Sequence, residues 1–123
     1  APQIPFINED MEQVLEAAWA AGARSAFYTV LRLPWELTPL FQQWLQQHYP
    51  QRAARVMARV REMRGGNDYQ SDFATRMKGH GVWAQLIATR FEKATQRLGF
   101  NRQRVELDNS AFHPPGAVQS RLF

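Results

Sequence analysis

The sequence predicts a mainly α-helical fold with a minor β part, and three observations lead to this prediction. After residue 34, apolar residues recur at helical spacing in three successive segments. Runs of β-type residues occur only near the start, as "PQIPFIN" and "SAFYTVLRL". The chain has 123 residues and is 45% hydrophobic, with four Trp and eight Phe. This composition is sufficient for the core of one modest domain, or of one piece of a larger protein.

Residues 1–33 are predicted to form a strand–helix–strand unit. Asn8 is the expected N-cap of the helix, acidic residues follow in its first turn, and Gly22 is expected to end it. Prolines at positions 2 and 5 favour a short or edge strand, because proline cannot donate to a ladder. Two strands cannot cover themselves, so the unit requires further parallel neighbours. We therefore expect the chain to be cut from a longer protein.

Residues 34–99 are predicted to contain three helices. The first begins at Thr38-Pro39 and ends before Pro50, the second ends at Gly65-Gly66, and the last spans about 82–98 before Gly99. Residues 100–123 are polar and irregular, and we expect a flexible tail. A single core is expected where the three helices meet, formed by Trp44, Met57, Val60, Trp83, Ile87 and Phe91.

The composition also excludes several kinds of site within the chain. There is no cysteine, which excludes disulfides, thiolate nucleophiles and cysteine-held metal clusters. His48, His80 and His113 show no metal-ligand spacing. No apolar run approaches the roughly 20 residues that span a bilayer, and the first residues lack the basic region of a signal peptide. We expect no metal, no cofactor and no catalytic residue in this chain, no membrane partner, and a cytoplasmic location.

A basic segment is the most distinctive feature of the middle of the chain. Five Arg and one Glu occur between Arg52 and Arg64, and Arg52, Arg55 and Arg59 share one helical face. The net charge of +4 favours anionic partners. One interpretation is an ordinary solvated face. The other is an anion-facing surface for DNA or RNA, to which glycines bring the backbone close. Its predicted residues are Arg55, Arg59, Arg64, Gly65, Gly66, Arg76, Lys78 and Gly79.

Two further patterns have a functional and an ordinary interpretation. Asp68 and Asp72 could orient a catalytic group or bind a cation, but such acids more often cap a turn or pair with arginine, and we predict the latter. The terminal "VQSRLF" resembles the peptide by which bacterial proteins dock on the DNA sliding clamp. Gln119, Leu122 and Phe123 would be the docking residues, although Ser120 replaces the usual apolar residue. The alternative is a tail that ends in apolar residues.

Three stretches together resemble a known family: "NEDMEQVLEAAWAAGARSAFYTVLRLPWE", "HYPQRAARVMARVREMRGGNDYQSDFATRMKGHGVWAQLI" and "RFEKATQRLGF". They are similar to the C-terminal part of bacterial radical-SAM proteins related to spore photoproduct lyase. The resemblance runs over most of residues 4–100, and the tail with a final Leu-Phe also fits.

The resemblance implies a partial (β/α) barrel whose [4Fe–4S] cluster is held by a Cys-x3-Cys-x2-Cys motif and cleaves S-adenosylmethionine. Residues 1–33 would be the last βαβ unit of that barrel, 34–99 a helical extension on the substrate side, and 100–123 the tail. The upstream radical-SAM domain would be the main partner and would hold the cluster and S-adenosylmethionine. The alternative function is a non-catalytic helical module that binds nucleic acid or docks on the sliding clamp. Relatedness at the level of fold does not transfer a substrate.

Overall fold

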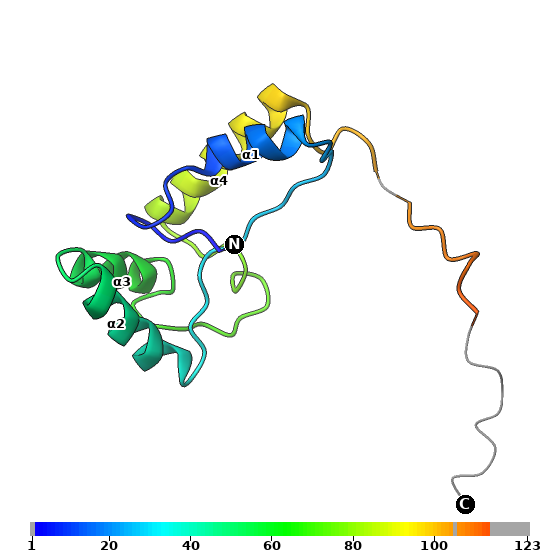
Figure 1. The fold of residues 1–123 in the computed structure, drawn as a ribbon. Coiled ribbons are helices and arrows are strands. Elements are labelled where there is room, and N and C mark those ends of the chain that lie inside the picture. Colours follow the sequence, from blue (N-terminus) through cyan, green and yellow to red (C-terminus); the bar gives the residue numbers. More distant parts are fainter. Residues whose placement is uncertain (1, 105, 114–123) are drawn as a thin grey trace, which may run out of the picture.

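The computed structural model describes residues 2–104 and 106–113, and this part of the chain is mainly helical, as predicted. The helices pack in two pairs, α1 against α4 and α2 against α3. Figure 1 shows the two pairs at opposite ends of the folded region, with extended segments running between them. The bounds of the helices are α1 Met11–Ala20, α2 Leu37–His48, α3 Ala53–Glu62 and α4 Val82–Leu98.

The predicted strand–helix–strand unit is reduced to one parallel β-bridge, between Gln3 and Val30 on either side of α1. The amide of Gln3 donates to the carbonyl of Thr29 at 2.7 Å, and the amide of Leu31 donates to the carbonyl of Gln3 at 3.1 Å. The ladder goes no further because Pro5 has no N–H and the amide of Ile4 donates to the side chain of Asn8. The order of the segments is therefore as expected, while regular strands do not form in the described residues.

The helix boundaries confirm most of the predicted stop signals and correct two start signals. Gly99 adopts a left-handed conformation with φ of 96° directly after α4, and Gly22 with φ of 104° follows α1. Asn8 is not the N-cap of α1, because Asp10 occupies that position. The side-chain nitrogen Nδ2 of Asn8 instead donates to the carbonyl of Pro2, which ties the first segment back on itself. Helix α2 begins at Leu37 with Glu36 as its N-cap, so the predicted start at Thr38-Pro39, which lies further along the chain, was wrong.

The apolar residues form two separate clusters, so the prediction of one core where three helices meet was wrong. Val60 and Met57 belong to the cluster of α2 and α3, while Ile87 belongs to the cluster of α1 and α4. Trp44 is 39% exposed and lies at the edge of the α2–α3 pair. The physical reason is the pairwise packing of the helices, which gives each pair its own interior.

Several contacts join the pairs. Phe6, which packs on the α2–α3 cluster, meets Trp83 of α4 edge to face, with ring centroids 5.3 Å apart. Met63 directly follows α3 and is buried in the α1–α4 cluster. Its carbonyl accepts a hydrogen bond of 3.0 Å from the amide of His80. The loop between α3 and α4 therefore closes back onto the end of α3. No helix in the described residues is long and apolar enough to cross a membrane.

Candidate anion-binding site

The side chain of Arg64 is completely buried at the centre of the molecule. Its Nη1 donates to the carbonyl of Thr75 at 3.0 Å, and its Nη2 donates to the carbonyls of Val30 and Leu31 at 3.1 and 2.9 Å. Arg64 thereby ties the end of α3 to two distant parts of the chain, the extended segment after α1 and the loop before α4. It does not join the predicted anion-facing surface, because none of its side chain reaches solvent.

The buried charge of Arg64 has no ion-pair partner among residues 2–104 and 106–113. Burial lowers the pKa of the Arg64 guanidinium and the nearby charge of Arg32 lowers it further, while Tyr69 acts in the opposite direction. An arginine stays protonated in proteins because its ordinary pKa lies far above neutral pH. The site therefore carries a permanent positive charge that three neutral carbonyls solvate.

Arg32 lies beside this buried charge and was not among the residues that the sequence singled out. Its Nη2 donates to the hydroxyl of Tyr69 at 3.3 Å, and its Nη1 contacts the sulfur of Met77 at 3.8 Å. Arg32 lies between the buried Leu31 and Leu33, near the end of the run "SAFYTVLRL" and in the extended segment that pairs with Gln3. A cation between apolar residues of a strand-like run is the signal that could have identified it.

The other predicted cations stack on different aromatic rings. The guanidinium of Arg55 lies 5.1 Å from the centroid of Phe6, and that of Arg76 lies 4.0 Å from the centroid of Phe73. The ammonium of Lys78 lies 3.5 Å from the centroid of the Tyr28 ring, and burial lowers its pKa. These contacts keep the cations against apolar surfaces and leave their charge partly accessible.

The structure brings three arginines of α3 and its preceding turn into a row, which we call the α3 arginine row: Arg52, Arg55 and Arg59. Nη1 of Arg52 donates to the carbonyl of Phe6 at 3.0 Å. Arg59 lies 5.1 Å over the ring of Trp83 and forms an ion pair of 2.5 Å with Glu62. Two residues of the predicted surface, Arg55 and Arg59, are thus neighbours along one helix. Arg52, which was not predicted for that surface, lies beside them.

The predicted glycines have structural roles in this loop. Gly65 has φ of 67°, and the amide of Gly66 returns to the carbonyl of Arg61 at 2.7 Å, which closes the end of α3. A Cβ on Gly79 would lie 3.0 Å from the carbonyl oxygen of Met63. The loop can therefore approach α3 closely only with glycine at this position.

The loop acids confirm the structural interpretation. Asp68 forms an ion pair of 2.5 Å with Arg61. Asp72 accepts hydrogen bonds from the hydroxyl of Thr75 at 3.1 Å and from the amide of Ala74 at 3.4 Å. Within residues 2–104 and 106–113, no group of three or more His, Cys, Asp or Glu residues could hold a metal ion.

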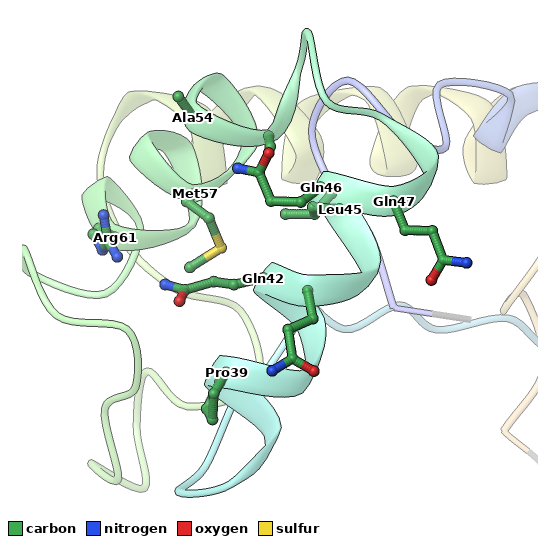
Figure 2. A pocket seen from close by; sticks show the side chains of 10 residues that line it. Pro39, Gln42, Leu45, Gln46, Gln47, Ala54, Met57 and Arg61 are labelled. Carbon is green, nitrogen blue, oxygen red and sulfur yellow. The ribbon is translucent and has the colours of Figure 1, made fainter.

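A groove of about 720 Å³ lies between α2 and α3. Figure 2 shows Gln42 of α2 and Met57 of α3 projecting into the space between the two helices. The polar lining consists mostly of glutamine amides, and its one charged side chain, Arg61, already pairs with Asp68. This groove contains no pair of titratable groups for acid–base catalysis. Its glutamine residues are Gln42, Gln43, Gln46 and Gln47.

Comparisons with known proteins give no further assignment: no protein-family model matches the chain, and neither a curated protein nor a solved structure matches it. The predicted docking residues Gln119, Leu122 and Phe123 lie outside the described residues.

Proposed function

We propose that this chain is the C-terminal segment of a radical-SAM enzyme related to spore photoproduct lyase, and that it forms part of the substrate side of that enzyme. The observation that carries the proposal is the parallel pairing of Gln3 with Val30 across α1. Parallel pairing across a helix is the connectivity of a βαβ unit, from which such barrels are built. The stretches that resemble this family give the same order of segments.

The contacts of Arg64 support a location on the substrate side. Active sites of (β/α) barrels lie at the carboxyl ends of the strands. Arg64 binds the carbonyls of Val30 and Leu31, at the end of the second strand-like segment, and holds the helical extension there. Arg32 lies at the same end. The helical extension would therefore lie at the substrate end of the barrel and not at the opposite end.

The cofactor of such an enzyme would belong to the upstream domain. When bound, a [4Fe–4S] cluster with S-adenosylmethionine supplies a 5′-deoxyadenosyl radical. This chain has no cysteine to ligate the cluster. Its own contribution is to hold the extension and its cations against the end of the barrel.

The coding sequence upstream of Ala1 tests this proposal directly. We expect it to encode Cys-x3-Cys-x2-Cys in the same reading frame. The longer protein should be brown when purified without oxygen and should form 5′-deoxyadenosine on reduction, whereas the 123-residue chain should be colourless. A stop codon or an unrelated domain at that place would refute the proposal.

The second candidate is a nucleic-acid-binding module without chemistry of its own, and the α3 arginine row favours it. Three guanidinium groups at helical spacing can contact successive phosphates, and the rings of Phe6 and Trp83 lie under the guanidinium groups of Arg55 and Arg59. Glu62 neutralises part of this charge through Arg59. The row therefore predicts weak binding that is dominated by backbone phosphates.

Fluorescence anisotropy with a labelled single-stranded oligonucleotide tests this second candidate. The affinity should fall with salt by about 0.7 log units per log unit of salt for each phosphate contacted. Arg52→Gln with Arg55→Gln should reduce that slope, whereas Lys93→Gln, on the exposed side of α4, should leave it unchanged. A flat salt dependence, or equal loss in the control, would exclude the row as a nucleic-acid surface.

A further inference from the structure

We propose that Arg32 and Tyr69, with the buried Arg64 behind them, form a binding site for a phosphate group. As a part of the substrate side, this site rests on the proposed function and narrows its substrate class to phosphorylated molecules or nucleic acids. The observation that carries it is a pair of neighbouring arginines that have no carboxylate partner in the described part of the chain.

The local charge is the first argument. Arg64 donates to the carbonyls of Val30 and Leu31, which directly precede Arg32, and the charge of Arg32 lowers the pKa of Arg64. Neither makes an ion pair with any residue in ranges 2–104 and 106–113. The acids of the nearby loop are engaged elsewhere, Asp68 with Arg61 and Asp72 with the hydroxyl of Thr75. A bound anion would offset this repulsion between like charges.

The free hydrogen-bonding capacity of Arg32 is the second argument. A guanidinium has five N–H donors, and the partners of Arg32 are a thioether sulfur at 3.8 Å and a hydroxyl at 3.3 Å, both weak. Its Nε is buried and has no hydrogen-bond partner among the described residues. Arg32 itself is partly exposed, so an anion can reach the outer edge of its guanidinium. Phosphate matches the fork of donors on arginine.

Tyr69 completes the set of donors. Its hydroxyl accepts the hydrogen bond from Arg32, so its own O–H remains able to donate to an anion. The guanidinium of Arg32 lies 5.8 Å from the centroid of the Tyr69 ring, which limits the directions in which it can point. The hydroxyl and the guanidinium can therefore contact the same phosphate.

The base of the site is rigid. The amide of Val30 donates to the carbonyl of Met77 at 2.8 Å, and the amide of Leu31 donates to that of Gln3. The carbonyls of both residues accept from Arg64. Hydrogen bonds thus hold the backbone of the two residues before Arg32. Anion binding therefore does not have to order the backbone from which the Arg32 side chain extends.

The proposal is tested by titrating the 123-residue chain with inorganic pyrophosphate at constant ionic strength. Calorimetry and thermal melting detect the binding. We expect binding together with a rise in melting temperature that chloride and acetate do not produce. Arg32→Gln should weaken binding at least about tenfold and Tyr69→Phe by a smaller factor, consistent with the loss of charged and neutral donors. Arg24→Gln is the matched control, because Arg24 is an exposed arginine that stacks on Trp19.

Several outcomes would overturn the site: equal affinity of Arg32→Gln and wild type, an equal loss in Arg24→Gln, or acetate binding as tight as that of pyrophosphate. A parallel titration with thymidine monophosphate and with a short thymidine oligonucleotide separates a small phosphorylated ligand from a nucleic acid. The binding assay needs no cluster. If Arg32→Gln loses binding but no cysteine motif is encoded upstream, the phosphate site is supported and the radical-SAM proposal is refuted. If the motif is encoded but Arg32→Gln binds as wild type does, the radical-SAM proposal is supported and the phosphate site is refuted.

Discussion

Nη2 of Arg64 donates a hydrogen bond of 2.9 Å to the carbonyl of Leu31, across a sequence separation of 33 residues. The same guanidinium binds the carbonyls of Val30 and Thr75. One side chain thus connects the end of α3 with the extended segment and the loop. The sequence suggests Arg64 as a ligand contact, whereas in the structure its buried guanidinium holds three segments together by hydrogen bonds.

Replacing Arg64 by methionine tests this role. Arg64→Met keeps most of the side-chain volume but leaves the carbonyls of Val30 and Leu31 without a donor, whereas the carbonyl of Thr75 keeps the amide of Gly79. Each unsatisfied buried group costs about 1–3 kcal/mol, so we expect urea unfolding to show a loss of at least about 2 kcal/mol. Arg55→Met, at an exposed arginine on α3, should change the stability by less than about 0.5 kcal/mol. Equal stability of the two variants would show that the buried guanidinium contributes nothing net.

Two glycines of the loop provide a matched comparison of close packing. Gly79 and Gly66 both have positive φ, of 68° and 87°, so alanine is strained at either position by about 1–2 kcal/mol. At Gly79 the added Cβ also meets the Met63 carbonyl at 3.0 Å, whereas at Gly66 nothing lies within 4 Å. Thermal melting should therefore show a larger loss for Gly79→Ala than for Gly66→Ala, by about 1–3 kcal/mol. Equal losses would mean that backbone strain alone decides both.

The two separate cores predict additive mutational effects. Val60→Ala and Ile87→Val remove volume from different clusters. Each should destabilise the chain, by about 2–4 and 0.5–1.5 kcal/mol respectively. In chemical denaturation, the loss of unfolding free energy in the double variant should equal the sum of the two single losses within about 0.5 kcal/mol. A larger deviation would show that the clusters act as one core after all.

The ion pair between Glu12 of α1 and Arg90 of α4 predicts a pH dependence. Nε and Nη2 of Arg90 bind the carboxylate at 2.8 and 2.5 Å, and this contact holds the pKa of Glu12 below its ordinary value. The stability it contributes is therefore present above that ordinary pKa and is lost as the pH falls through the lowered one.

Melting curves of Glu12→Gln and of wild type should differ near pH 6 and converge towards pH 3. The difference should stay below about 1 kcal/mol, because both side chains are more than a third exposed. Glu106→Gln, at an exposed position in the chain after α4, serves as the control and should show no such convergence. A constant difference between Glu12→Gln and wild type across this range would contradict the assignment.

The sequence by itself determined the class of the fold and where its helices stop. Apolar residues at helical spacing and glycines such as Gly22 and Gly99 act within a few residues, so their effect can be read locally. The order of the two strand-like segments around α1 was equally predictable, and the single bridge between Gln3 and Val30 agrees with it.

Tertiary structure decided how the cations are used. Helical spacing places Arg55 and Arg59 on one face, but the sequence contains nothing that distinguishes them from Arg64, five residues later and just beyond the end of α3. The difference arises because three carbonyls from distant segments converge on Arg64 and solvate its charge, which makes its burial possible. The same convergence brings Arg32 beside Tyr69, 37 residues away. Contacts at such separations depend on how the segments pack, and local sequence patterns do not encode them.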